Sequence, residues 1–104
     1  MALTRAFRDT VLARVQRDPA FRDALLTEGV NALLAGEVEA GKSILRDYIK
    51  ATVGFEALAA TTGAPSKSLM RMFGPRGNPT AGNLFAVIRA LQRASGVTLE
   101  VVAG

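Results

Sequence analysis

The stretch FEALAATTGAPSKSLMRMFGPRGNPTAGNLFAVIRAL, residues 55–91, decides the fold of this chain. Its pattern is a short helix, a glycine-containing turn, a second helix, a Gly/Pro loop and a third helix, which is the layout of a helix-turn-helix. Gly63 ends the first helix because glycine adopts a left-handed conformation without a Cβ clash. Pro65 cannot continue that helix but suits the start of the next one. We therefore predict a helix-turn-helix module here.

The second helix, predicted over residues 66–73, has two chemically different faces. The apolar residues share one stripe: Leu69, Met72 and Phe73. The other stripe carries a hydroxyl, two cations and a flexible thioether: Ser66, Lys67, Met70 and Arg71. Such side chains on a recognition helix contact base edges in the major groove, so we expect these four to contact DNA bases. The alternative is an ordinary solvated helix face.

Charge is distributed unevenly along the chain. The formal net charge is +4 with a sequence pI of about 10.4. Residues 1–49 hold seven basic and seven acidic side chains, whereas residues 50–104 hold six basic and two acidic ones. The whole excess of positive charge therefore lies in the half with the predicted helix-turn-helix, as expected for a surface that meets a polyanion.

The third helix is predicted over residues 81–95, with Thr80 as its N-cap and Gly96 at its end. Its apolar residues are expected to be buried: Leu84, Phe85, Ile88 and Leu91. Four residues outside the second helix are expected to contact DNA phosphates: Lys50, Arg76, Asn78 and Arg89. For Arg89 the alternative is solubility of an exposed surface, and for Asn78 it is shaping of the loop.

The residues that carry this layout also resemble a known family. They are Leu58, Ala59, Gly63, Leu69, Arg71, the Gly77-Asn78-Pro79-Thr80 loop, Leu84, Ile88, Leu91 and Gly96. In this register residues 54–101 resemble the lambda-repressor-like (XRE) helix-turn-helix family, and most of all its HigA-type antitoxin, or addiction-module antidote, branch. Where that family often has a Ser or Thr helix cap this chain has Pro65, which leaves Ala64 or Ser66 as the cap of the second helix. The resemblance implies a second role, binding a small RelE/ParE-like toxin and repressing the shared operon.

The first half of the chain predicts three further helices. The first carries apolar residues at helical spacing: Leu3, Phe7, Val11, Leu12 and Val15. The second begins at Asp18-Pro19 and closes at Gly36, with an expected buried stripe of Phe21, Leu25, Leu26, Leu33 and Leu34. The third, over residues 37–52, is expected to bury Val38, Ile44, Leu45, Tyr48 and Ile49. These neutral helices are the candidate surface for a protein partner, although they could equally complete the core.

Residues 36–43, GEVEAGKS, match the phosphate-loop pattern G-x-x-x-x-G-K-[ST]. A working phosphate loop follows a buried strand, but the preceding residues have helical periodicity. Two glutamates within the loop would repel a nucleotide, and no later strand ends in an aspartate that could hold magnesium. We therefore interpret the match as chance and do not expect nucleotide binding at Gly36–Ser43.

Composition excludes several classes of chemistry. The 104 residues include neither cysteine nor histidine, so disulfides, Cys or His nucleophiles and the commonest metal ligand are absent. We expect no catalytic residues, no metal and no cofactor. No run of about 18 apolar residues and no signal-like N-terminus is present, so neither a membrane span nor secretion is expected, and the location is expected to be cytoplasmic.

The C-terminal stretch VTLEVV, residues 97–102, alternates and is rich in β-branched residues, which predicts a strand. A lone strand needs a partner, either a short extended segment or the same strand of a second copy, so we expect a homodimer that suits a palindromic operator. Residues 1–104 are thus predicted to form one all-α domain of five to six helices: an N-terminal helical extension (1–53), a lambda-repressor-like module (54–96) and a short strand (97–104).

The functional expectation is a sequence-specific DNA-binding transcriptional repressor, not an enzyme, acting as the antitoxin of a toxin-antitoxin system. The alternative is a stand-alone helix-turn-helix regulator without a toxin. A third hypothesis, a nucleotide-dependent enzyme, predicts magnesium-dependent nucleotide binding that is lost on Lys42→Ala.

Overall fold

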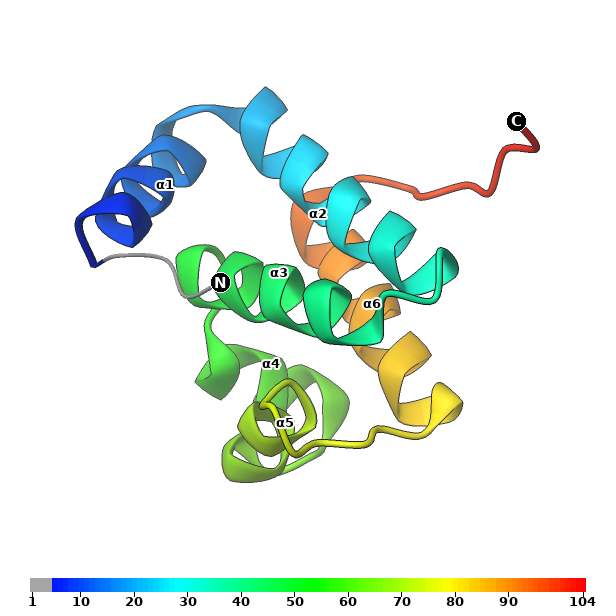
Figure 1. Ribbon diagram of the computed structural model, residues 1–104. Helices are drawn as coiled ribbons and strands as arrows, with labels where there is room; N and C mark the ends of the chain where they lie inside the picture. The colour runs from blue at the N-terminus through cyan, green and yellow to red at the C-terminus, as the bar shows by residue number, and fades with distance from the viewer. Residues whose placement is uncertain (1–4) are drawn as a thin grey trace.

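The computed structural model describes the backbone of residues 5–104 and the side chains of residues 9–104. Within this part the chain forms helices joined by short loops (Figure 1). They are α1 (Arg5–Arg17), α2 (Pro19–Leu34), α3 (Val38–Ala51), α4 (Phe55–Thr62), α5 (Ser66–Met72) and α6 (Ala81–Ser95). The predicted all-α class is confirmed. The expected burial of Leu3 and Phe7 falls outside the described side chains.

Local capping explains where two of the helices begin. The Asp18 carboxylate accepts a hydrogen bond of 3.2 Å from the backbone N–H of Phe21, with Pro19 in the first turn of α2. The Thr80 hydroxyl accepts one of 3.1 Å from the N–H of Asn83 at the start of α6. Each cap satisfies a backbone donor that the helix cannot pair itself, a contribution of about 1 kcal/mol. Both predicted caps are confirmed.

The turn between α4 and α5 is built as its glycine predicts. Gly63 has a φ of +79°, and its N–H donates to the carbonyl of Ala59 at 2.9 Å. In α5 the N-cap is Pro65, which makes no side-chain capping bond, so neither Ala64 nor Ser66 caps the helix as expected. The physical reason is that Pro65 occupies the N-cap position: its backbone is extended, with ψ near 143°, and its carbonyl accepts the first helical bond from the N–H of Leu69.

The three N-terminal helices pack against one another, and the closest pair is α2 with α3. Helices α2 and α3 approach closely at two glycines. A Cβ added to Gly29 would lie 2.8 Å from Cδ2 of Leu45, and one added to Gly41 would lie 2.7 Å from Cδ2 of Leu33. Both contacts are closer than real side chains allow, so the small residues at these sites set the distance between the two helices.

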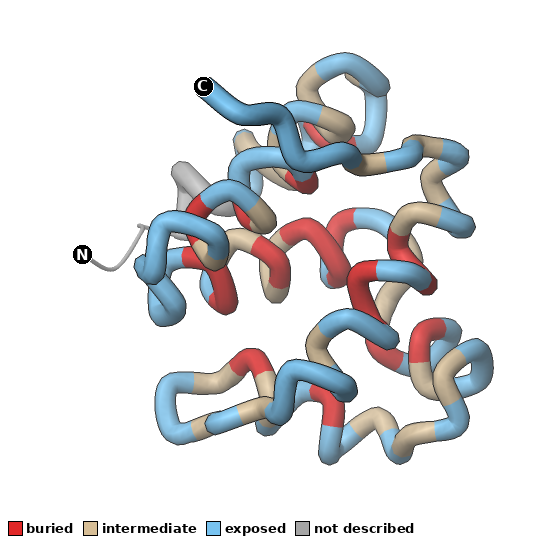
Figure 2. The backbone as a smooth tube through the Cα atoms, turned by 90° about the vertical axis from the view of Figure 1, so that its right-hand side faces the viewer, coloured by how far each residue is buried: buried red, intermediate tan, exposed pale blue. Residues whose placement is uncertain are grey.

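The core joins α2 and α3 to α4, α5 and α6. Its buried members come from α2 to α6 and gather where these helices meet (Figure 2). They are Leu26, Leu45, Tyr48, Ile49, Phe55, Leu58, Leu69, Phe73, Val87, Ala90 and Leu91. The rings of Phe55 and Phe73 lie 6.4 Å apart at a tilt of 52°, which ties the start of α4 to the end of α5. Helix α5 therefore rests on a packed base.

Three apolar side chains expected in the core lie on the surface. Leu34 is 59% exposed, Phe85 is 62% exposed and Val38 is 47% exposed. Leu34 ends α2, Val38 begins α3 and Phe85 lies in the second turn of α6, so each extends beyond the region where the helices are covered by neighbours. Helical spacing identifies an apolar stripe but not how far along the helix its cover reaches.

The predicted C-terminal strand is wrong. Residues 97–104 are extended but unpaired, and the described chain contains no strand. Leu99 is half-buried against the core, and its N–H donates to Oε1 of Gln92 at 2.8 Å. Only Val97 and Leu99 of the alternating pattern turn inward, whereas Val101 and Val102 are exposed, because no second strand is available to complete a ladder.

Candidate nucleic-acid interface

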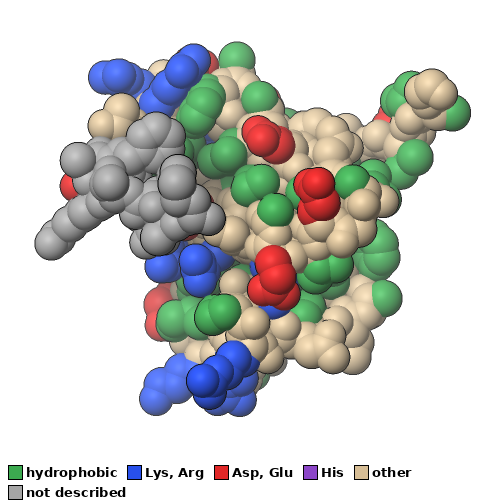
Figure 3. Space-filling model, viewed as in Figure 1, with side chains coloured by type: hydrophobic (Ala, Val, Ile, Leu, Met, Phe, Trp, Pro, Cys, Tyr) green, Lys and Arg blue, Asp and Glu red, His purple; other side chains and the backbone are tan. Residues whose placement is uncertain are grey.

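Helix α5 presents to solvent the face that the sequence identified. Leu69 and Phe73 are buried beneath it, whereas Lys67 and Arg71 are exposed one turn apart on the outer side. Met70, between them, is 44% exposed. Lys and Arg side chains gather over the α4–α5 end of the molecule, at the lower left of Figure 3. This surface combines cations with a flexible apolar side chain on a short helix that projects from the core.

Ser66, the first residue of α5, is half-buried and already has a partner. Its hydroxyl lies 3.2 Å from Oε1 of the exposed Glu56, in the first turn of α4. A carboxylate here lowers the positive potential beside Lys67, and Ser66 would have to leave Glu56 to donate to a base. Sequence reasoning missed this pair because its members are ten residues apart on different helices.

Of the four expected phosphate contacts, two lie directly after α5. Arg76 and Asn78 are both exposed on the loop of residues 73–80. Lys50 is exposed in the last turn of α3. Arg89 is exposed on α6, where it lines a shallow hollow with Arg93 and the start of the tail. The structure thus brings Arg76 and Asn78 together with the base-contact candidates and carries Lys50 and Arg89 on other helices.

Lys42, the lysine of the phosphate-loop pattern, is buried, and its ammonium is paired with groups of the protein itself. Its side chain is 2% exposed, and its ammonium donates to the carbonyls of Gly74 at 3.0 Å and Gly77 at 2.7 Å. A carboxylate oxygen of Glu39 lies 2.9 Å from the same nitrogen. These contacts occupy all three N–H donors of the ammonium. The sequence did hold a signal of this burial, because Lys42 lies three residues before Leu45 and therefore on the same, buried side of α3.

The other residues of the phosphate-loop pattern join α2 to α3 and pack against α2. The residues before it form α2, and Gly41 is the close-packing position against that helix. The pattern therefore spans a helix-to-helix turn and the first turn of α3, and its lysine points to the loop after α5. A phosphate cradle needs its lysine at the phosphates, and this lysine already has three partners.

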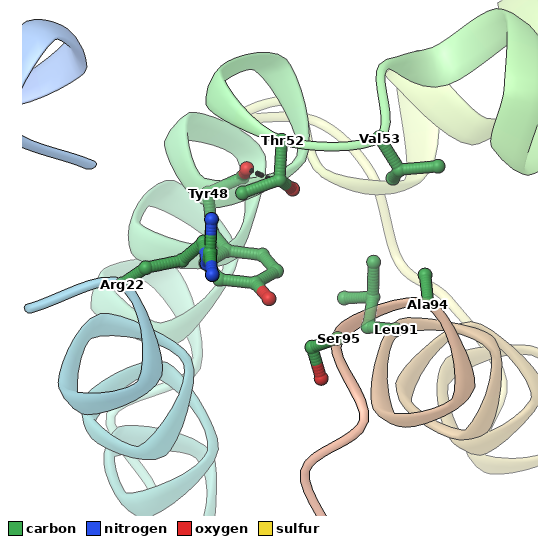
Figure 4. Close-up of a pocket in the computed structure, with 7 residues that line it drawn as sticks. All are labelled: Arg22, Tyr48, Thr52, Val53, Leu91, Ala94 and Ser95. Atoms are coloured by element: carbon green, nitrogen blue, oxygen red, sulfur yellow. Dashed lines mark hydrogen bonds between the residues drawn. The ribbon is translucent and has the colours of Figure 1, made fainter. Parts of the chain in front are cut away.

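A second hollow, of about 340 Å³, lies where α2, α3 and α6 meet (Figure 4). The ring of Tyr48 lies between the Arg22 side chain and Ser95, and Thr52 donates to the Tyr48 carbonyl at 2.7 Å. Burial raises the pKa of the Tyr48 phenol, and a hydrogen bond with Ser95 lowers it less strongly. The tyrosine thus stays neutral well beyond physiological pH.

An apolar groove lies between the end of α2, helix α6 and the C-terminal tail. Leu34, Phe85, Ile88, Leu99 and Val101 line it. Hydrophobic side chains along the tail are visible at the upper right of Figure 3. No backbone–backbone hydrogen bond is formed by residues 98–104, and of their N–H groups that of Leu99 is bonded to the side chain of Gln92.

Residues 5–104 contain no helix long and apolar enough to cross a membrane. Among the described residues, no three acidic side chains gather where a metal ion could be held. Comparisons with protein-family models, with curated proteins and with solved structures find no match for this chain. Function is therefore inferred from the residues and their arrangement.

Proposed function

We propose that this protein is a sequence-specific DNA-binding regulator of transcription that reads the major groove with α5. The observation that carries the proposal is the exposed face of Lys67, Met70 and Arg71 on a helix held from below by Leu69 and Phe73. A recognition helix needs this combination, because its reading side chains must be free while its backbone is fixed. Helix α4, the turn at Gly63 and helix α5 follow one another in the order of a helix-turn-helix.

Charge supports the same surface. The net excess of four positive charges comes from residues 50–104, and Arg76 and Asn78 follow α5 on an exposed loop. Phosphate contacts position a protein on DNA and make its affinity depend on salt, whereas base contacts specify the sequence. We assign the first task to Arg76, Asn78, Lys50 and Arg89, and the second to Ser66, Lys67, Met70 and Arg71.

The test is binding of the purified protein to its own promoter region and to a scrambled duplex at two salt concentrations. Lys67→Ala and Arg71→Ala should each weaken promoter binding by about 1–3 kcal/mol and scrambled binding much less. Arg17→Ala is the matched control, since it removes the same charge from an exposed site on α1. Equal binding of both duplexes by the wild type would refute sequence-specific reading.

We further propose a homodimer, with the second copy covering the apolar groove and the unpaired tail. An extended segment with free backbone groups and β-branched residues is a template for pairing with another chain, and two-fold symmetry suits a palindromic site. Phe85→Asp should shift the dimer to monomer in analytical ultracentrifugation, whereas Ala86→Asp, on the neighbouring exposed position, should not. A wild type that is monomeric at all concentrations would refute the dimer.

The role as an antidote to a small RelE/ParE-like toxin is supported by the resemblance of residues 54–101. It differs from a stand-alone regulator in one observable, a stable complex with the product of a neighbouring toxin-like reading frame. Co-expression of the two followed by size-exclusion chromatography distinguishes them. The stand-alone regulator is the conclusion if no complex forms and promoter binding persists.

A further inference from the structure

The loop between α5 and α6 is a tight turn with an unusual support. The N–H of Gly77 donates to the carbonyl of Gly74 at 3.0 Å, which closes a four-residue turn with Pro75 at its second position. Proline suits that position because its φ is already set. Arg76, at the third position, and Asn78, just after the turn, are both exposed. The turn therefore displays outward the two side chains assigned to DNA phosphates.

Beneath the turn lies the ammonium of Lys42. It donates to the carbonyls of Gly74 and Gly77, so that both ends of the turn point to one buried cation. These partners are 32 and 35 residues away in the sequence, on the far side of the helix-turn-helix. A buried ammonium is costly unless it is fully paired, and here two carbonyls and the Glu39 carboxylate complete its shell.

We propose that Lys42 is a positioning residue for DNA binding: its buried ammonium ties α3 to the Gly74–Gly77 turn and thereby holds Arg76 and Asn78 in place for phosphate contact. This inference rests on the proposed function and extends it to a residue that never touches DNA. Through Lys42, helix α3 would then help to position the residues that contact DNA. Gly41 and Lys42 of the phosphate-loop pattern thus have a structural use.

The physical basis is preorganisation. With Lys42 in place, the turn is ordered before DNA arrives, so Arg76 binds without the entropic cost of fixing the loop. Without it, the Gly77 carbonyl loses its donor and the Gly74 carbonyl keeps only the N–H of Gly77, so the turn moves to reach water. Arg76 then loses its defined position while its charge remains.

Lys42→Met is the test variant, because it keeps most of the side-chain volume and removes every donor. Glu39→Gln is the matched control: it removes the ion pair at an exposed carboxylate and leaves both carbonyl hydrogen bonds intact. Lys42→Ala, which also removes every donor and leaves space that water can enter, is the second variant and decides the question if Lys42→Met does not fold. Far-UV circular dichroism establishes that each variant has the native helix content.

The first measurement is amide hydrogen exchange of the free protein. The Gly77 amide is protected by its bond to Gly74 and should exchange at least tenfold faster in Lys42→Met than in the wild type. Amides within α6 should still exchange only at the rate that global unfolding of each variant allows. Glu39→Gln should change the Gly77 rate little. An unchanged Gly77 rate in Lys42→Met, or in Lys42→Ala if that variant is used, overturns the proposal.

The second measurement is promoter binding as a function of salt. Lys42→Met should weaken binding about five- to tenfold and reduce the salt slope by about 1, as the loss of one phosphate contact does. Adding Arg76→Ala to Lys42→Met should then cost little, although Arg76→Ala alone costs the full amount. Additive losses would overturn the positioning role.

The two proposals fail in different ways. If the wild type does not prefer its promoter, the proposed function fails, and the tie between Lys42 and the turn is still decided by the exchange of the Gly77 amide. If the wild type binds the promoter and Lys42→Met binds it equally well, the regulator stands and the positioning role of Lys42 is refuted.

Discussion

Gly77→Ala is expected to be one of the most destabilising single-methyl changes in the described chain. An added Cβ would collide with the carbonyl oxygen of Arg71 and lie 2.5 Å from that of Met72 and 2.8 Å from its carbonyl carbon. All three atoms belong to the backbone at the end of α5, so no side-chain rotation relieves the contact. The turn must therefore move away from α5.

The magnitude follows from three contributions. Forcing a methyl group into a packed site costs about 1–3 kcal/mol. Movement of Gly77 also breaks the hydrogen bond from the Lys42 ammonium, and a bond of this charged type contributes about 1.5–3 kcal/mol. The lower entropy of the unfolded alanine chain offsets about 0.4–1 kcal/mol. The expected loss is therefore about 2–5 kcal/mol of unfolding free energy, a large part of the stability of a small domain.

Urea unfolding followed by far-UV circular dichroism measures this loss as a lower midpoint at an unchanged slope. Gly82→Ala is the control, because a Cβ at that exposed position in the first turn of α6 meets nothing within 4 Å. It should leave the protein as stable or up to about 1 kcal/mol more stable. A Gly77→Ala protein within about 0.5 kcal/mol of the wild type would refute the packing of the turn against α5.

Three other predictions concern the core, a cap and the tyrosine. Leu69→Ala should lower the unfolding free energy by about 2–5 kcal/mol, whereas Met70→Ala, on the exposed face of α5, should change it by less than about 0.5 kcal/mol; similar losses would contradict the orientation of the helix. Thr80→Ala should cost about 1 kcal/mol in the same assay through loss of the bond to the N–H at the start of α6, and no loss would argue against the cap. Tyr48 is the only tyrosine, so tyrosinate absorbance reports its ionisation alone, with an expected midpoint above the ordinary value of about 10. Because the folded state holds the proton more tightly, stability is unaffected by this group below about pH 10 and falls as pH rises through the raised pKa; a Tyr48→Phe protein with the same alkaline loss would show that the tyrosine is not its source.

Most of the exposed face of α5 could be predicted from the sequence, and the contacts around that face could not. The spacing of Leu69 and Phe73 against Lys67 and Arg71 already separates a buried from an exposed side, because the helical period is a property of neighbouring residues. The hydrogen bond between Ser66 and Glu56 depends on how the turn at residue 63 orients two helices. A pairing of this kind has no period and leaves no pattern in the chain.

The apolar residues divide in the same way. Leucines and phenylalanines at helical spacing correctly indicated helices and most of the core, but the same spacing placed Phe85 and Leu34 inside. Whether an apolar side chain is covered depends on the partner element above it, which lies elsewhere in the sequence. The C-terminal tail is the matching case for strands, since alternation describes an extended segment and only a neighbouring strand makes it part of a sheet.

Local sequence is enough to predict the helices and several of their ends, because Asp18, Gly63, Thr80 and Gly96 act on backbone groups within four residues of themselves. It also determined that the excess positive charge follows residue 49. Only the tertiary structure decided the role of Lys42, whose place in a phosphate-loop pattern suggests one chemistry and whose burial imposes another. A lysine finds its acceptors through space, and here they are carbonyls 32 and 35 residues away, which no local pattern encodes.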